Sequence, residues 1–278
     1  MLDLWGARKL LAATSGTLII VSYVVCIGLA VGTDVYIGGL KFPYFSDTGR
    51  EAPGYYVFAS LNSVASILLL GFVILQYKFV KAWTDDAKCR NVTATVFGAI
   101  APVFSIILSV VSSNTNDDVH FYSAILFFVC MVLHLGFSMT IYWYLNSVYD
   151  AFKSMHVARV VVAALFFISF LLYLPIGLAI NCPFENLSLD DCINQEDLGV
   201  EYCTDLKDPD NVTLTVLYDY SPCVDTNHLR SATQFCSIFF LMVWIIISAF
   251  DPTPPTSGTG DERVKFDNTE ETFDKSNA

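Results

Sequence analysis

Charged side chains are scarce in this chain of 278 residues. Asp, Glu, Lys and Arg together make up 15% of it, whereas soluble domains carry about 25%. The sequence also has no phosphate-binding glycine loop, no dinucleotide fingerprint and no metal-ligand spacing. The absence of these motifs argues against a soluble nucleotide- or metal-dependent enzyme. We therefore expect no cofactor, no metal and no nucleic-acid partner. With 54% hydrophobic residues, the composition indicates a multi-pass membrane protein.

Six apolar stretches are long enough to cross a hydrocarbon core of about 30 Å, which takes about 20 residues in a helix. They lie near residues 10–31, 55–77, 92–111, 120–145, 160–180 and 231–250. Helices are expected because a spanning backbone must satisfy its own hydrogen bonds, and the stretches lack the alternation of barrel strands. The predicted fold is an all-α transmembrane domain over residues 1–250. Its first stretch is interpreted as a retained helix rather than a signal peptide.

Basic residues are distributed unevenly over the predicted connections, and this sets the expected orientation. Eleven of the 15 Lys and Arg residues lie before the first helix, in the second connection, beside the fourth connection or in the tail. We therefore expect both termini to be cytosolic. The tail, residues 251–278, is acidic and rich in Ser, Thr and Gly, so it is predicted to be disordered.

The predicted fifth connection, residues 181–229, is exoplasmic in this orientation. It contains four of the eight cysteines: Cys182, Cys192, Cys203 and Cys223. An even set in an exoplasmic loop predicts two disulfides, with three possible pairings. The loop also carries glycosylation sequons at Asn186 and Asn211, whereas the sequon at Asn91 falls on the cytosolic side. Its eleven acidic residues lack the spacing of a calcium-binding loop, so we expect a solvated cap pinned by disulfides.

The segment at residues 42–56, FPYFSDTGREAPGYY, contains the tripeptide Asp47-Thr48-Gly49, which carries the catalytic carboxylate of aspartic proteases. Such a protease needs two carboxylates that share a proton, and the sequence has no second copy. We interpret the segment as a turn in which Ser46 and Asp47 accept backbone hydrogen bonds and Gly49 takes a positive φ. The neighbouring aromatic residues are expected at the outer membrane interface: Tyr44, Phe45, Tyr55 and Tyr56.

Three short motifs, taken in order, resemble a known family. Residues 43–49, Pro43-Tyr44-Phe45-Ser46-Asp47-Thr48-Gly49, precede the second helix, His120 opens the fourth, and His228-Leu-Arg-Ser231-Ala232 opens the sixth. This set resembles the DRAM/FRAG/Sfk family, the six-helix relatives of damage-regulated autophagy modulators with a CWH-like N-terminal domain. Where the family has Glu-Trp after the last motif, this chain has Gln234-Phe235, so a role of that glutamate is not carried over.

The resemblance implies a function without catalysis. It implies a regulator or adaptor in the plasma membrane or the endolysosomal system, which modulates autophagy or membrane-lipid homeostasis, phosphoinositides included. Its partners would be membrane lipids, together with either membrane proteins or a cytosolic complex. The alternatives are a factor that remodels the lipid of GPI anchors and a channel subunit or modulator.

Four ionisable side chains are candidate functional residues. Asp47, His120 and His228 all fall near the exoplasmic interface, where they could form a structural hydrogen-bonded cluster, a lipid-headgroup site or a catalytic site. We favour the structural cluster because no nucleophile–base pair accompanies it. His134 falls near the middle of the fourth helix, where a neutral ring bonded to a neighbouring helix is favoured over a proton relay.

Overall fold

The structure is a computed structural model that describes residues 3–180, 182 and 184–254. Six helices in this part of the chain are long and apolar enough to cross a membrane. They are α1 (Leu4–Gly32), α3 (Gly54–Trp83), α4 (Lys88–Val110), α5 (Asp117–Val148), α6 (Lys153–Tyr173) and α10 (Val224–Ile247). The predicted six-helix membrane fold is therefore confirmed. The predicted tail lies outside the described residues from residue 255 onwards.

Most of the helices extend beyond the apolar stretches that predict them, because their terminal turns are polar. α1 begins at Leu4, where the Asp3 carboxylate caps the amide of Gly6. α5 begins at Asp117, where the Asn116 side chain accepts a hydrogen bond from the amide of Val119 at 3.0 Å. Such caps satisfy amides that have no partner inside the helix. The fifth predicted span is instead divided into α6 and the short α7 (Pro175–Ala179), since proline lacks the amide that would continue the helix.

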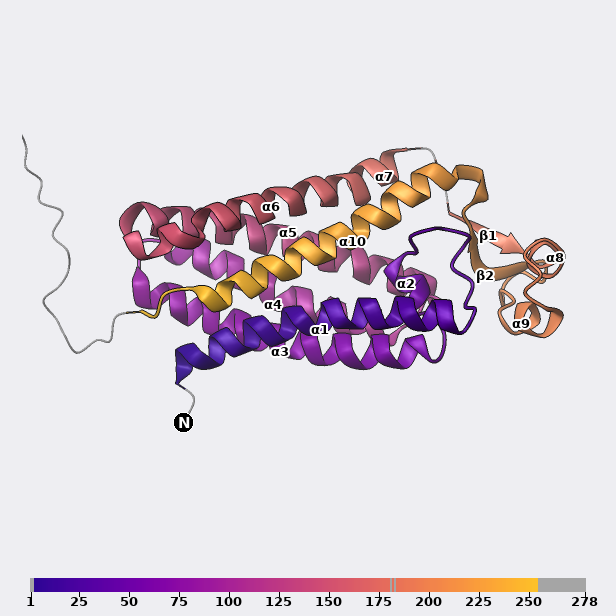
Figure 1. Cartoon of the computed structure of the whole chain (residues 1–278), viewed down its shortest axis with the longest axis horizontal. Helices are drawn as coiled ribbons and strands as arrows, with labels where there is room; N and C mark the ends of the chain where they lie inside the picture. Colours follow the sequence, from indigo (N-terminus) through magenta and orange to yellow (C-terminus); the bar gives the residue numbers. More distant parts are fainter. Residues whose placement is uncertain (1–2, 181, 183, 255–278) are drawn as a thin grey trace, which may run out of the picture.

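The helices form an elongated bundle (Figure 1), and the contacts between neighbouring helices close roughly into a ring. α1 packs against α3 and α10, α3 against α4, α4 against α5, and α6 against α10, whereas α5 and α6 touch only lightly. Leu69, Met131, Leu135, Leu241 and Met242 are among the buried residues of its core. The start of α1 and the end of α10 lie at one end of the bundle, called here the terminal end. The opposite end, called the cap end, carries the long connection between α7 and α10.

This connection folds into a small unit, called here the cap (residues 182 and 184–223). It contains β1 (Glu185–Ser188), α8 (Leu189–Asn194), α9 (Val200–Asp205) and β2 (Leu214–Asp219). β1 pairs antiparallel with β2, so the cap contains a two-stranded sheet that the all-α prediction lacks. Of the three possible disulfide pairings, the structure has the nested one, Cys182–Cys223 around Cys192–Cys203.

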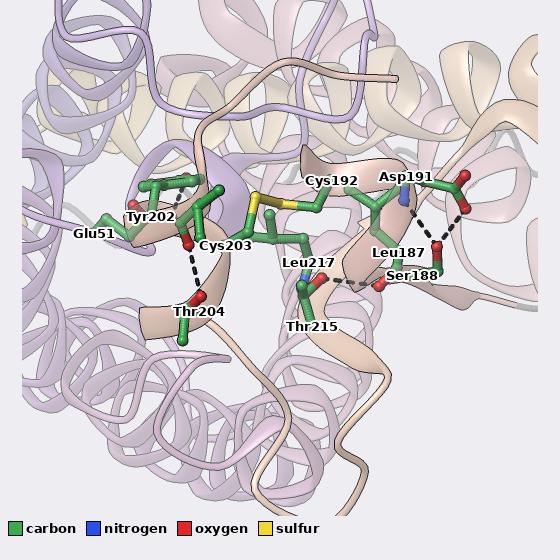
Figure 2. The surroundings of a disulfide bond; sticks show 11 residues. Glu51, Leu187, Ser188, Asp191, Cys192, Tyr202, Cys203, Thr204, Thr215 and Leu217 are labelled. Carbon is green, nitrogen blue, oxygen red and sulfur yellow. Dashed lines mark hydrogen bonds between the residues drawn. A yellow bond between two sulfur atoms is a disulfide. The ribbon is translucent and has the colours of Figure 1, made fainter. Parts of the chain in front are cut away.

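The inner disulfide lies in the hydrophobic core of the cap. Figure 2 shows Cys192 and Cys203 beside Leu187 and Leu217, all of which are buried. On the bundle side, the Tyr202 hydroxyl donates a hydrogen bond to the Glu51 carboxylate at 3.0 Å. The cap therefore has its own core and is fastened to the loop that follows α1.

We expect glycosylation at Asn211, which is exposed between α9 and β2, and less at Asn186, which is half-buried in β1. Asn91 is buried, and its amide donates to the carbonyl of Tyr77 at 3.0 Å. Glycosidase treatment should shift the gel mobility of the wild type but not that of an Asn186→Gln/Asn211→Gln variant. A shift that persists in the variant would point to Asn91 and would invert the predicted orientation.

A buried cluster of charges closes the terminal end. The Asp251 carboxylate accepts hydrogen bonds from Arg8 and Arg159 and, at 2.6 Å, from the Tyr142 hydroxyl. Arg8 also donates to the Gln76 side chain at 2.7 Å. The three charged residues are at most 2% exposed. The sequence analysis placed Asp251 in the disordered tail, and the structure corrects this prediction, because Asp251 is ordered and buried. The prediction that counted Arg8 and Arg159 as cytosolic basic residues did not foresee that both are buried.

Candidate functional site

A cavity of about 120 Å³ lies inside the bundle near the cap end. Its wall is mostly apolar and includes Phe58, Leu108, Phe121, Phe127, Phe128 and Ile238. Polar side chains also line it: Asp47, Asn62, His120, Tyr173, Tyr220, Arg230 and Gln234. Its volume approaches that of the engineered apolar cavity of about 150 Å³ that binds benzene. The cavity can therefore enclose a small chemical group or one part of a larger amphiphile.

Asp47 connects the first loop to the cap above this cavity. It lies in α2 (Phe45–Thr48) and is 3% exposed. The Tyr220 hydroxyl donates to one carboxylate oxygen at 2.7 Å, and the Arg50 guanidinium lies 3.8 Å from the other. Burial raises the pKa of Asp47 above its ordinary value of 3.8, although Arg50 and Tyr220 act in the opposite direction.

The predicted turn is a short helix, and its details differ from the prediction. The Asp47 side chain receives the Tyr220 hydroxyl rather than a backbone amide. Gly49 has a φ of −107°, so it is not in the left-handed region. A Cβ atom on Gly49 would lie 2.5 Å from the ring of Phe58. This glycine is therefore required for a close approach to α3, which a local motif does not reveal.

The aromatic residues of the first loop are directed mainly inward. Tyr44 and Phe45, which were predicted at the membrane interface, are 4% and 7% exposed, whereas Tyr56 is 67% exposed. The Tyr44 hydroxyl donates to the Asn227 side chain at 3.0 Å, and the Phe45 amide donates to the Gln234 side chain at 2.9 Å. The first loop is thus bound to α10, because its polar groups find partners there.

Asp47 and His120 line the same cavity, but His228 does not. His120 Nδ1 lies 2.8 Å from the Val111 carbonyl oxygen, and His228 Nε2 accepts a hydrogen bond from the Lys41 amide at 3.0 Å. The structure therefore does not form the predicted three-residue cluster. The reason is the helical period, since residues four apart share a face of α10 and residues two apart do not. Arg230 and Gln234 occupy the cavity face, and His228 points elsewhere.

Two residues that line the cavity, Arg230 and Asn62, have side-chain atoms without polar partners among the described residues. Arg230 is 3% exposed, and its guanidinium carbon lies 4.4 Å from the centroid of the Phe184 ring. It makes no ion pair with the described residues, and its enclosed Nε atom has no hydrogen-bond partner there. Asn62 is 4% exposed, with both its amide nitrogen and its oxygen unpartnered there. A buried polar group without a hydrogen-bond partner lowers the stability of the fold by about 1–3 kcal/mol. A ligand in the cavity that bonds to these two side chains would remove this cost.

His134 lies deeper in the bundle, away from this cavity. Its Nδ1 atom is 2.8 Å from the Ala94 carbonyl oxygen of α4, and its ring packs edge-on against Trp244. A Cβ atom on Gly98 would lie 2.4 Å from that nitrogen, so this glycine allows the two helices to approach. The arrangement is the bond to a neighbouring helix that was favoured from the sequence.

Asp47 gives a graded test of its structural role. Asp47→Asn keeps an acceptor for Tyr220 and should be tolerated, because Arg50 retains its contacts with Glu51 and the Tyr36 carbonyl. Asp47→Ala leaves the buried hydroxyl of Tyr220 unpaired and should cost about 1–3 kcal/mol. Surface abundance and cellular activity of the two variants distinguish the roles. Equal loss of activity at normal abundance would instead make Asp47 part of a ligand site.

The raised pKa of Asp47 predicts a pH dependence. The folded protein binds the proton of this carboxyl more tightly than the unfolded chain does. The corresponding stability is present below the unfolded pKa and is lost as pH rises through the folded pKa. The unfolding temperature of the wild type should therefore rise relative to that of Asp47→Asn as the pH is lowered from neutrality towards the ordinary pKa. A difference that does not change with pH would contradict the assignment.

Within the described residues, no group of three or more His, Cys, Asp or Glu side chains is placed to hold a metal ion. A family model for the Frag1/DRAM/Sfk1/Cwh43P N-terminal domain matches residues 7–187. The match runs from near the start of α1 through α7 into the first strand of the cap, and α10 lies beyond it. No curated protein and no solved structure matches the chain.

Proposed function

The chain belongs to the Frag1/DRAM/Sfk1/Cwh43P N-terminal domain family, and we propose that it is a non-enzymatic membrane regulator that binds a membrane lipid in the cavity near the cap end. Through this lipid it modulates membrane-lipid homeostasis or autophagy in the plasma membrane or the endolysosomal system. The cap faces the exoplasmic side and both termini face the cytosol. The uneven distribution of basic residues supports this orientation.

The observation that carries the proposal is the amphipathic character of the cavity. Its wall is largely aromatic and aliphatic, yet Asn62 and Arg230 face it without partners in the described residues. Polar groups in a membrane-spanning bundle are costly unless something satisfies them. A lipid satisfies both parts of the wall, because its headgroup bonds to the polar side chains and its hydrocarbon contacts the aromatic ones. Water would satisfy only the polar part.

The bonding of the ionisable groups supports binding rather than catalysis. The Asp47 carboxylate is held by Tyr220 and Arg50, and His120 Nδ1 is held at the Val111 carbonyl. No hydrogen bond among the described residues joins either of them to a serine, threonine or cysteine. A nucleophile activated by a base requires such a contact. The geometry therefore supports a role in which these groups hold the cap and the first loop over the cavity.

A variant that fills the cavity tests the proposal. Ala124 of α5 lines the cavity, so Ala124→Phe should occupy it without changing any charge. Val129 lies on the same helix and is 39% exposed on its outer surface, which makes Val129→Phe the matched control. In knockout cells, Val129→Phe should restore lipid composition and autophagic flux, and Ala124→Phe should not, at equal abundance.

The same knockout cells distinguish the proposed lipid-binding regulator from a factor that remodels GPI-anchor lipids. Full restoration by Ala124→Phe would contradict a role for the cavity. A knockout that alters GPI-anchored proteins at the surface while leaving autophagic flux unchanged would favour remodelling of GPI-anchor lipids instead.

A further inference from the structure

We propose that the ligand of this cavity is an amphiphile with an oxyanion headgroup, a phosphate or a carboxylate, that pairs with Arg230. This inference rests on the proposed function and names the chemistry of its lipid. Arg230 is the natural anchor because a guanidinium stays protonated and offers a planar set of donors that matches an oxyanion.

Arg230 differs from the other buried arginines in the described part of the chain. Arg8 and Arg159 share the carboxylate of Asp251, and Arg50 pairs with Glu51 at 2.9 Å. Each of these three thus has a carboxylate partner from the protein. Arg230 has the Phe184 ring over its guanidinium and no carboxylate oxygen within 4.0 Å among those residues. A buried charge requires a counter-charge, and the cavity is the place from which one can come.

The acidic groups around the cavity do not supply this counter-charge. Asp47 is engaged by Tyr220 and Arg50. Asp117 is exposed at the start of α5, where it accepts a hydrogen bond from the Tyr218 hydroxyl. Asp47 thus contacts Tyr220 and Arg50 rather than Arg230, and Asp117 is exposed to solvent. Among the described residues no carboxylate pairs with Arg230, so we assign its charge to a ligand.

The order of side chains along the cavity indicates how an amphiphile lies in it. Arg230 is in the second turn of α10, close to the cap, and Asn62 is in the third turn of α3. The oxyanion therefore lies towards the cap, and the amide of Asn62 can bond to ester, amide or hydroxyl groups that follow it. Phe127 and Ile238 give the apolar wall that the first carbons of the chain contact.

The remainder of the hydrocarbon chain must lie outside the cavity. A space of about 120 Å³ encloses a headgroup and a short piece of chain. α5 and α6 touch only lightly, so we place the exit of the chain between these two helices. Phe128 of α5 and Tyr173 of α6 are buried and packed there with ring centroids 5.3 Å apart, so the two rings must separate to let the chain pass.

The test uses the full chain in nanodiscs of phosphatidylcholine and a set of probes with the same chain. The probes are dodecyl phosphate, dodecanoate, dodecanol and dodecyltrimethylammonium, with inorganic phosphate as the free anion. Affinity and the shift in unfolding temperature are measured for the wild type, Arg230→Met, Arg230→Lys and Lys41→Gln. Lys41 is exposed at the cap end, so Lys41→Gln controls for charge at that surface. Without probe, Arg230→Met should be at least as stable as the wild type, because it removes a buried charge that has no carboxylate partner among the described residues.

Dodecyl phosphate or dodecanoate should bind the wild type and Lys41→Gln, and Arg230→Met should lose about tenfold or more in affinity. Arg230→Lys should retain part of the binding, and the neutral and cationic probes should bind weakly. If the wild type and Arg230→Met bound all dodecyl probes with equal affinity, the oxyanion site would be overturned. The proposal of a lipid-binding cavity would then still stand. If inorganic phosphate bound with the same affinity as dodecyl phosphate, the proposal that the ligand is an amphiphile would be overturned. If no dodecyl probe bound, the proposed function would fail as well.

Discussion

Replacing Asp251 with alanine should destabilise the folded protein by about 3–5 kcal/mol, because it leaves two buried arginines without their counter-charge. Arg8 of α1 and Arg159 of α6 both donate to this carboxylate, and each is at most 2% exposed. The Tyr142 hydroxyl of α5 would lose its acceptor as well. Asp251 follows the short 3-10 helix Ser248–Phe250 at the end of α10, so the substitution removes a contact that joins this end of α10 to α1, α5 and α6.

Asp150→Ala is the matched control, because Asp150 forms an ion pair with Lys153 in which the two side chains are 91% and 65% exposed. Such a surface pair contributes at most about 1 kcal/mol. The unfolding temperature in detergent should fall far more for Asp251→Ala than for Asp150→Ala. Replacing all three charges together, with Arg8→Met, Arg159→Met and Asp251→Leu, should recover much of the loss. Equal effects of the two alanine variants would show that the buried cluster is not held by charge.

Loss of the Cys182–Cys223 disulfide should cost about 2–5 kcal/mol and retain the protein in the early secretory pathway. This bond joins the chain after α7 to the residue before α10, across 41 residues, whereas Cys192–Cys203 spans 11. The loop-entropy model gives the longer loop about 1 kcal/mol more stabilisation. The outer bond also holds the two ends of the cap over the cavity.

Surface biotinylation of a Cys182→Ser/Cys223→Ser variant measures this effect, and non-reducing mass spectrometry establishes which cysteines are paired. Cys89→Ser is the control, because Cys89 is exposed and unpaired. The double variant should be depleted from the surface, and Cys89→Ser should not. Wild-type surface levels of the double variant would contradict a structural role for the outer bond.

The six membrane helices could be predicted because the length needed to cross a bilayer depends only on helix geometry and apolar composition. The charged cluster at the terminal end could not be predicted in this way. Arg8 and Asp251 are separated by 243 residues, and composition does not state which charges meet. Counting Arg8 and Arg159 as cytosolic basic residues gave an orientation but no information on their burial.

The candidate site could be predicted only in part. The motif around Asp47 led to the right region, but the partners of Asp47 come from the cap and from Arg50. The helical period of α10 offered a signal that the motif comparison did not use, since Arg230 and Gln234 are one turn apart and share the cavity face. That Arg230 has no carboxylate partner among the described residues could only be recognised once its surroundings were known.

Native mass spectrometry of the protein released from cell membranes tests the lipid-binding cavity most directly. The measurement compares the wild type with Ala124→Phe, which fills the cavity, and with Val129→Phe on the outer surface of the same helix. The wild type and Val129→Phe should retain a bound lipid whose mass and fragmentation reveal a phosphate or carboxylate, and Ala124→Phe should lose it. Retention of the same lipid by Ala124→Phe, or a wild-type protein that carries no lipid, would contradict the account.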